Sequence, residues 1–177
     1  MPNRNVHCVE NLQEWQEHFE NGWLAAYQST GEVDWHTYRP PINKSHISGK
    51  GVNLSTSRLM LISSAGAFLP ASQQPFNASS ALGDYSIREL PTSVDLKDLS
   101  FAHDHYDHQA VDEDPQVLVP LDHLRALQKD GAIGELIAPI SFMGYQPDVF
   151  RVVTETLPAI LEKTRSEKAN AVLLVPS

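Results

Sequence analysis

The chain has 177 residues, of which 41% are apolar, and a formal net charge of −9. This length and apolar content predict one globular domain rather than a disordered chain. The acidic balance excludes the basic surface that nucleic acids and anionic membranes require, and no apolar run approaches the ~20 residues of a membrane-spanning helix.

The first predicted element is an amphipathic helix over residues 11–28. Its apolar residues recur every three or four positions, as on one face of a helix: Leu12, Trp15, Phe19, Trp23 and Ala26. We interpret the aromatic face as packing anchors, with a dimer contact as the alternative. Residues 30–52 are polar and contain Pro40 and Pro41, as is typical of a connector. We therefore expect a helix and polar linker over residues 1–52 and an α/β domain over residues 53–177, together forming one compact unit.

Strands and helices alternate in the rest of the chain. The predicted strands are short apolar runs at residues 59–62, 99–102, 136–143 and 171–175. One helix is expected between Pro120 and Gly131, and a second begins at Asp148 and is kinked or split by Pro158. Residues 69–95 are rich in Pro, Ser and Gly and are predicted as a long loop. This alternation predicts an α/β fold with a mostly parallel open sheet and helices on both faces, a three-layer arrangement of the flavodoxin or Rossmann type.

The sequence before the helix contains no pattern typical of a signal peptide, so we expect a cytoplasmic protein. Cys8 is its one cysteine, which excludes an intramolecular disulfide and any CxxC pair. We interpret Cys8 as an incidental thiol.

The predicted strands end in segments that define a candidate crevice. Ligands of open α/β sheets bind outside the carboxyl ends of the strands, and four parallel strands would place all their ends along one edge. Ser64 and Gly66 follow the first strand, and Gly144 and Tyr145 follow the third. The start of the helix at Asp148 favours an anionic group, although Asp148 itself is expected to cap it. Both glycines have the alternative role of shaping tight turns.

The second predicted strand ends at residues 103–108, which hold three histidines and two aspartates. His103 and His105 would point to the same side of an extended chain. With His108 they form a ligand set suited to zinc or iron, although a polar loop and a metal-free binding segment are both alternatives. The spacing also occurs in the metallo-β-lactamase fold, but only His123 follows it, inside a predicted helix.

Six sequence blocks carry a family resemblance. They are ISSAGAFLPASQQPFN (62–77), DYSIRELP (84–91), HDHYDHQAVDED (103–114), VPLDHLRALQKDGAIGEL (119–136), SFMGY (141–145) and AVLLVPS (171–177). In their order and approximate spacing they resemble the selenoprotein-B component family of glycine, sarcosine, betaine and D-proline reductases.

The resemblance implies a reductase that cleaves a C–N bond through attack of a selenolate or thiolate on the α-carbon of a small amino-acid-like substrate. It implies catalytic roles in proton transfer and positioning for His103, His105 and Asp107. The implied substrate-binding residues are Ser64, Gly66, Tyr106, Gly144 and Tyr145. In the family, the nucleophile and a partner cysteine follow the stretch that matches residues 173–176. We therefore expect this chain to lack the redox nucleophile, because neither Ser177 nor Cys8 can replace it.

Three functions remain open from the sequence. The first is a reductase subunit whose nucleophile comes from another chain or a lost C-terminal segment. The second is a non-catalytic accessory or scaffold subunit that uses the aromatic helix as its contact surface. The third is a metal-dependent hydrolase or lyase built on the histidines. We expect a small-molecule substrate and either a protein partner or a homo-oligomer, with no certain cofactor apart from the alternative zinc or iron.

Overall fold

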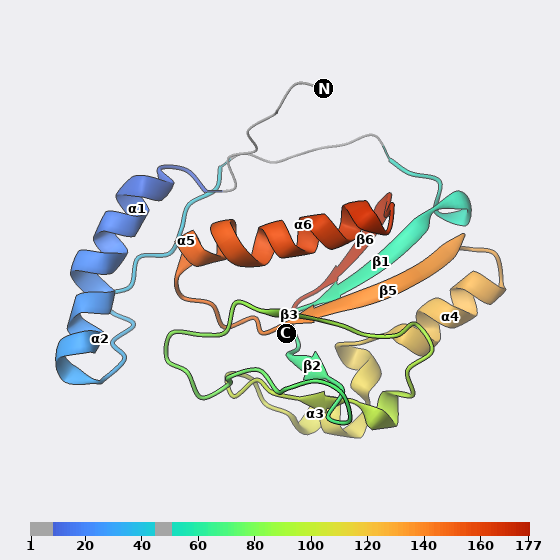
Figure 1. Cartoon of the computed structure of the whole chain (residues 1–177), viewed down its shortest axis with the longest axis horizontal. Helices are drawn as coiled ribbons and strands as arrows, with labels where there is room; N and C mark the ends of the chain where they lie inside the picture. The colour runs from blue at the N-terminus through green and yellow to red at the C-terminus, as the bar shows by residue number, and fades with distance from the viewer. Residues whose placement is uncertain (1–8, 45–50) are drawn as a thin grey trace.

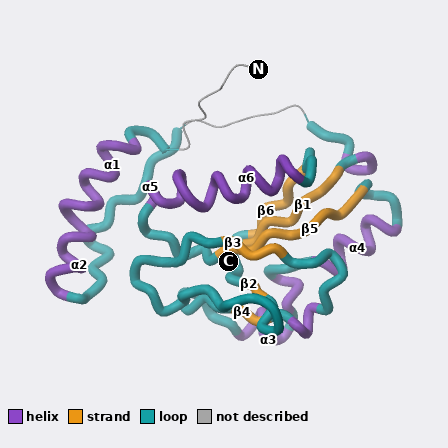
Figure 2. The backbone as a smooth tube through the Cα atoms, in the orientation of Figure 1, coloured by secondary structure: helices purple, strands orange, loops and turns teal. Residues whose placement is uncertain are grey.

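A mostly parallel sheet forms the centre of the protein. The computed structural model describes residues 9–44 and 51–177 (Figures 1 and 2). Strands β1 (Arg58–Ser63), β5 (Glu135–Phe142) and β6 (Ala171–Val175) run parallel, and β3 (Ile87–Glu89) is antiparallel to β5, in the order β3-β5-β1-β6. Because Ser63 pairs with both Ser141 and Val175, the three parallel strands end at the same level. The predicted α/β fold with an open, mostly parallel sheet is confirmed.

The central strand β1 buries side chains on both faces of the sheet. Leu59 and Leu61 pack in the cluster that contains Leu121 and Leu124 of α4 (Leu121–Lys129). Met60 and Ile62 alternate with them and pack in the opposite cluster, against α6 (Leu157–Ser166). Figure 1 shows α6 and α4 on opposite sides of the sheet. A strand buried on both faces requires a continuous apolar run. The strand predicted from the apolar run at residues 59–62 is therefore confirmed.

The predicted strand at residues 99–102 does not join this sheet, which corrects the expected alignment of four parallel strand ends. Only Ser100–Phe101 is extended, as β4, and it pairs antiparallel with β2 (Ala67–Phe68) in a separate ribbon. The apolar character of the run has another cause, because Leu99 is buried in the core cluster beside α4. The predicted loop at residues 69–95 also contains an element that was not expected, the three-residue edge strand β3.

The N-terminal helix forms as predicted and covers one end of the C-terminal helix (Figure 1). It runs without a break through α1 (Leu12–His18), a π-helical turn (Phe19–Leu24) and α2 (Ala25–Thr30). Its buried aromatic residues, Trp15, Phe19 and Trp23, pack against Val149. The aromatic face is thus covered within the chain, which supports the packing-anchor interpretation over an exposed contact surface.

In the second long helix, the disturbance predicted at Pro158 takes the form of a π-helical turn within an unbroken helix. It consists of α5 (Val149–Arg151), a π-helical turn (Val152–Thr156) and α6. Pro158 has no N–H for the carbonyl of Thr154, and its ring crowds that carbonyl in a regular α-helix. A wider π-helical turn at this point relieves the conflict. No helix in residues 9–44 or 51–177 is long and apolar enough to cross a membrane.

Candidate functional site at the carboxyl ends of the strands

Three strand ends meet at Ser64. The Ser177 N–H donates to Ser64 Oγ (2.7 Å), the Ser177 hydroxyl donates to the Ser64 carbonyl (3.1 Å), and the Gly144 N–H donates to the same carbonyl (3.0 Å). The chain passes from β1 to β5 over the face covered by α4, and from β5 to β6 over the face covered by α6. Ser64 therefore follows the central strand where the connections diverge, the usual ligand-binding position of such sheets.

The positions of the hydroxyl hydrogens determine which groups this corner can bind. The two hydroxyl oxygens lie 2.9 Å apart. Either hydroxyl can be the donor between them, and the Ser177 hydrogen can instead be directed to the Ser64 carbonyl. When the Ser177 hydrogen is directed to the carbonyl and Ser64 donates, each hydroxyl oxygen keeps one unused lone pair that can accept a hydrogen bond from a protonated amine.

Gly144 allows this close approach. A Cβ at position 144 would lie 3.1 Å from Ser64 Cβ and 3.2 Å from Ser177 Oγ. Ser64 and Gly144, predicted as substrate-binding, are thus brought together. Ser177 was not among the predicted site residues, although its position directly after the last strand was the signal that could have identified it.

Gly66 places the histidine segment beside this corner. Its φ is +67°, and a Cβ there would lie 2.5 Å from the Ala102 carbonyl oxygen. Its N–H donates to the Phe142 carbonyl, and its own carbonyl accepts from the Ala102 N–H, both at 2.9 Å. Gly66 therefore does shape a turn, and the turn fixes the residue before His103 against the end of β1. The antiparallel ribbon of β2 and β4, rather than a fourth parallel strand, thus brings the histidine segment to the carboxyl ends of the parallel strands.

His103 is buried and neutral. Its side chain is 4% exposed, and its Nδ1 accepts the His105 N–H at 3.2 Å, which leaves the ring proton on Nε2. Burial, and next the neighbouring His105 ring, lower the pKa of His103 below its ordinary value. At neutral pH this imidazole can donate through Nε2–H but carries no charge.

Two tyrosines connect the histidine segment to the strand ends. Tyr106 donates its hydroxyl to the Ala65 carbonyl (3.1 Å), and burial raises its pKa to about 12. His105 stacks on Tyr145, with ring centroids 3.6 Å apart and planes inclined by 14°. Trp35, from the polar connector, meets Tyr145 edge to face at 5.8 Å. Trp35 was not predicted here, because nothing in its local sequence indicates a contact with a residue so far along the chain.

The remaining predicted residues have structural partners. Asp107 accepts the Gln109 N–H (2.9 Å), a local turn contact just before α3 (Gln109–Glu113), whose N-cap residue is His108. His108 Nε2 lies 2.6 Å from the His103 carbonyl oxygen. In the part of the chain that the structure describes, no three His, Cys, Asp or Glu side chains are grouped to hold one metal ion. The zinc or iron site at His103, His105 and His108 stays a prediction.

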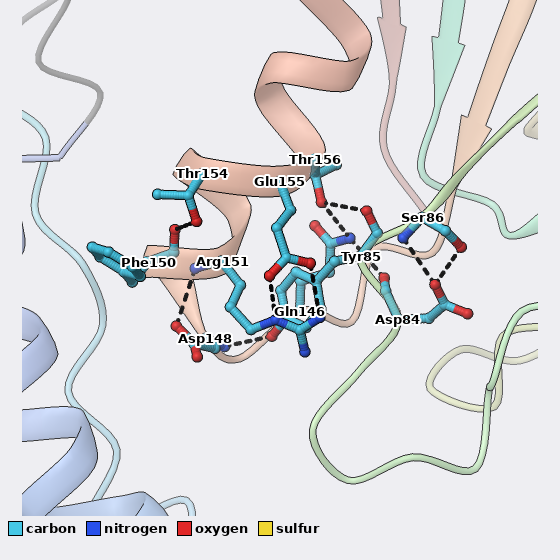
Figure 3. A network of polar contacts seen from close by, with 10 residues as sticks. All are labelled: Asp84, Tyr85, Ser86, Gln146, Asp148, Phe150, Arg151, Thr154, Glu155 and Thr156. Atoms are coloured by element: carbon cyan, nitrogen blue, oxygen red, sulfur yellow. Dashed lines mark hydrogen bonds and ion pairs between the residues drawn. The ribbon is translucent and has the colours of Figure 1, made fainter.

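A polar network fixes the segment that leads from Gly144 into α5 (Figure 3). The Gln146 amide donates to the Asp84 carbonyl (2.8 Å) and to Thr156 Oγ1 (3.1 Å). The Asp148 N–H donates to the Tyr85 hydroxyl (2.8 Å), and the Asp148 carboxylate accepts the N–H three residues on (3.2 Å). Asp148 therefore caps the helix, as expected, and its carboxylate occupies the position that an anionic ligand would need.

Comparison with known proteins identifies the family. A family model described as glycine/sarcosine/betaine reductase selenoprotein B matches residues 40–174. The chain belongs to this family. No solved structure matches the chain.

Two curated relatives agree with this membership of the selenoprotein-B family. D-proline reductase subunit gamma of Acetoanaerobium sticklandii is 33% identical over 123 residues, which are 68% of this chain and 49% of the relative. Sarcosine reductase complex component B subunit beta of Peptoclostridium acidaminophilum is 33% identical over 86 residues, which are 48% of this chain and 20% of the relative. The chain thus spans about half the length of the first relative and a fifth of the second.

Proposed function

We propose that this protein is a subunit of a reductase complex that cleaves the C–N bond of a small amino-acid-like substrate, and that the substrate binds at Ser64, Gly144 and Ser177. The observation that supports this proposal is the meeting of three of the family-like sequence blocks at one point. ISSAG contributes Ser64, SFMGY contributes Gly144, and VLLVPS contributes Ser177, and all three residues are joined by hydrogen bonds.

The chemistry of the corner suits the nitrogen end of such a substrate. The free lone pairs of the Ser64 and Ser177 hydroxyls accept hydrogen bonds from a protonated amine. His103 would position the substrate as a neutral donor through Nε2–H, since its lowered pKa keeps it uncharged near neutral pH. His105 would provide the acid–base group beside Tyr145.

The reaction needs a sulfur or selenium nucleophile. In the step we propose, a thiolate or selenolate forms a bond to the substrate α-carbon, the C–N bond breaks toward nitrogen, and the amine takes up a proton. A second thiol then attacks the bound sulfur or selenium, the carbon takes up a proton, and the thiol pair is oxidised by two electrons to a disulfide or selenide-sulfide. Cys8, the chain's one cysteine, lies outside the described residues. The nucleophile is therefore proposed to come from another chain or from residues that follow Ser177.

The decisive experiment combines mass, composition and binding on the natively expressed protein. Intact mass and selenium content establish whether a Cys or selenocysteine segment accompanies the 177 residues. NMR titration with D-proline and sarcosine should then shift the amide signals of Ser64, Gly144 and Ser177, whereas betaine, whose quaternary nitrogen carries no N–H, should shift them less. Ser64→Ala should weaken binding, whereas Ser166→Ala, a serine on the surface of α6, should not. If none of these ligands shifts the three signals, the substrate-binding proposal is wrong and a non-catalytic accessory subunit is favoured.

A further inference from the structure

The segment that follows Gly144 is held between two parts of the chain that are distant from it in sequence. One of them is the loop at residues 77–86. The Tyr145 hydroxyl donates to the Ala81 carbonyl (2.9 Å), and a Cβ at Gly83 would lie 2.5 Å from the Tyr145 carbonyl oxygen. Burial raises the pKa of Tyr145, so its hydroxyl stays protonated as a donor. This loop therefore fixes both the hydroxyl and the main chain of the tyrosine.

The other part is a turn of the polar connector at residues 34–38. Asp34 Oδ1 accepts the His36 N–H, and the Asp34 carbonyl accepts the Thr37 hydroxyl, both at 2.9 Å. An aspartate that bonds to the main chain two residues on gives a turn a defined local shape. The aromatic side chains of this turn are therefore presented from a fixed main chain.

This turn contacts the segment after Gly144 at two points. Trp35 meets the Tyr145 ring edge to face, with centroids 5.8 Å apart and planes inclined by 86°. The Tyr38 hydroxyl donates to the carbonyl of residue 147 (2.9 Å). Trp35 is supported in turn by Trp23 of the N-terminal helix, with centroids 5.4 Å apart. Trp35 thus connects the packing of that helix to Tyr145.

The His105 ring depends on Tyr145 for its orientation. It stacks on Tyr145 with centroids 3.6 Å apart, and it meets the His103 ring edge to face at 5.8 Å. Within residues 9–44 and 51–177, the His105 ring forms no hydrogen bond. Its side chain is otherwise exposed to solvent. Ring contacts, and chiefly the stack on Tyr145, therefore determine where this imidazole lies.

The exposure of Trp35 separates this contact from packing of the core. Trp15 and Trp23 are 7% and 2% exposed, as expected of residues that hold the N-terminal helix in place, whereas Trp35 is 48% exposed. A side chain that keeps half of its surface in water contributes less to the stability of the core. The consequence of removing Trp35 should therefore be local, at Tyr145 and His105.

We propose that Trp35 is a positioning residue of the candidate site, which holds Tyr145 in the orientation on which the His105 imidazole stacks. This inference rests on the proposed function, in which His105 is the acid–base group. The N-terminal helix and the connector then serve the site as well as the fold, because they place Trp35 against Tyr145.

NMR of the His105 ring protons tests the contact without reference to activity. The signals are assigned with His105→Gln, and all variants of the full chain are measured at one pH. Trp35→Ala should move these signals at least halfway to their positions in Tyr145→Ala, whereas Trp35→Phe, which keeps an aromatic edge, should leave them near wild type. Ile42→Ala is the control, because Ile42 is 56% exposed in the same connector. Urea unfolding verifies folding, and Trp35→Leu replaces the alanine variant if that variant is unfolded.

Kinetics of the native reductase complex test the role in the reaction. Trp35→Ala should lower kcat by about tenfold or more with little change in KM, and Trp35→Phe should restore most of the loss. Unmoved His105 signals in Trp35→Ala would overturn the inference and leave the proposed function intact. Moved signals with an unchanged kcat would also overturn it, since the placement of His105 would then not matter to turnover. A complex without reductase activity would refute the proposed function itself, and the NMR result alone would then decide whether Trp35 positions His105.

Discussion

Gly66→Ala should destabilise the protein far more than the same change at Gly131. Both glycines have φ near +70°, where a side chain is strained. They differ in their surroundings, since a Cβ at position 66 would lie 2.5 Å from the Ala102 carbonyl oxygen and one at position 131 would meet nothing within 4 Å. Gly131 therefore serves as a control that carries the backbone strain alone.

The magnitudes follow from these two terms. Left-handed backbone costs an L-residue about 1–2 kcal/mol, and this is the loss in stability expected for Gly131→Ala. Forcing an extra carbon into a packed site adds about 1–3 kcal/mol, which brings the expected loss for Gly66→Ala to about 2–5 kcal/mol. The lower entropy of the unfolded alanine chain affects both variants alike and cancels in the comparison.

Urea unfolding of the wild type and both variants gives the free energies of unfolding. The NMR signals of the His103 ring give a second readout, because Gly66 fixes the Ala102 N–H and carbonyl immediately before it. These signals should move in Gly66→Ala and stay in place in Gly131→Ala. Equal losses of stability in the two variants would show that the contact with Ala102 does not determine the turn.

Further predictions concern the buried polar groups. Thr156→Val removes a fully buried hydroxyl that donates to a main-chain carbonyl at 3.0 Å. It should lower the free energy of unfolding, measured in urea, by about 1–3 kcal/mol. Thr154 is exposed, so Thr154→Val should change this free energy by less than about 0.5 kcal/mol. The pKa of His103 is lowered in the folded protein, so the unfolded chain binds more protons at pH values between that pKa and 6.5. The free energy of unfolding should therefore rise with pH through this window. His103→Gln should flatten this dependence of the free energy of unfolding on pH. An unchanged slope would show that another group titrates there. Tyr38→Phe loses the hydrogen bond to the Pro147 carbonyl and should cost about 0.5–1.5 kcal/mol, measured by urea unfolding, with faster proteolysis of the N-terminal helix; protection equal to wild type would contradict this anchoring role.

The sequence predicted most of the central fold because its apolar pattern reports burial. β1 and β5 read as continuous apolar runs since both faces of these strands are covered, and the helices carry apolar stripes for the same reason. Burial does not specify pairing, however. Leu99 is apolar because it packs beside α4, and this led to a strand being expected in the parallel sheet. The sequence did not predict β3, because this three-residue edge strand is only partly buried and has no apolar pattern to detect.

The candidate site was predictable where topology alone determines it. Ser64 and Gly144 follow strands of one parallel sheet, so their ends had to meet, and hydrogen bonds now join them. Contacts between elements that are distant in the chain carry no such signature. The edge contact of Trp35 with Tyr145 depends on how the connector folds back, and the contact of Asp107 with the Gln109 N–H depends on where α3 begins. The catalytic role that the family resemblance implies for Asp107 stays a prediction.

Under the proposed function, the hydrogen bonding of the corner suits positioning of the substrate rather than nucleophilic attack by a serine. The Ser64 and Ser177 hydroxyl oxygens lie 2.9 Å apart and the Ser177 hydroxyl also reaches the Ser64 carbonyl, so both hydroxyls take part in joining the strand ends. Among residues 9–44 and 51–177, neither hydroxyl is hydrogen-bonded to a histidine or carboxylate, as an activated serine nucleophile would be. His103 is neutral and uses Nδ1 as an acceptor. In the proposed reaction these groups would orient the amine of the substrate, and a thiolate or selenolate would form the bond to carbon.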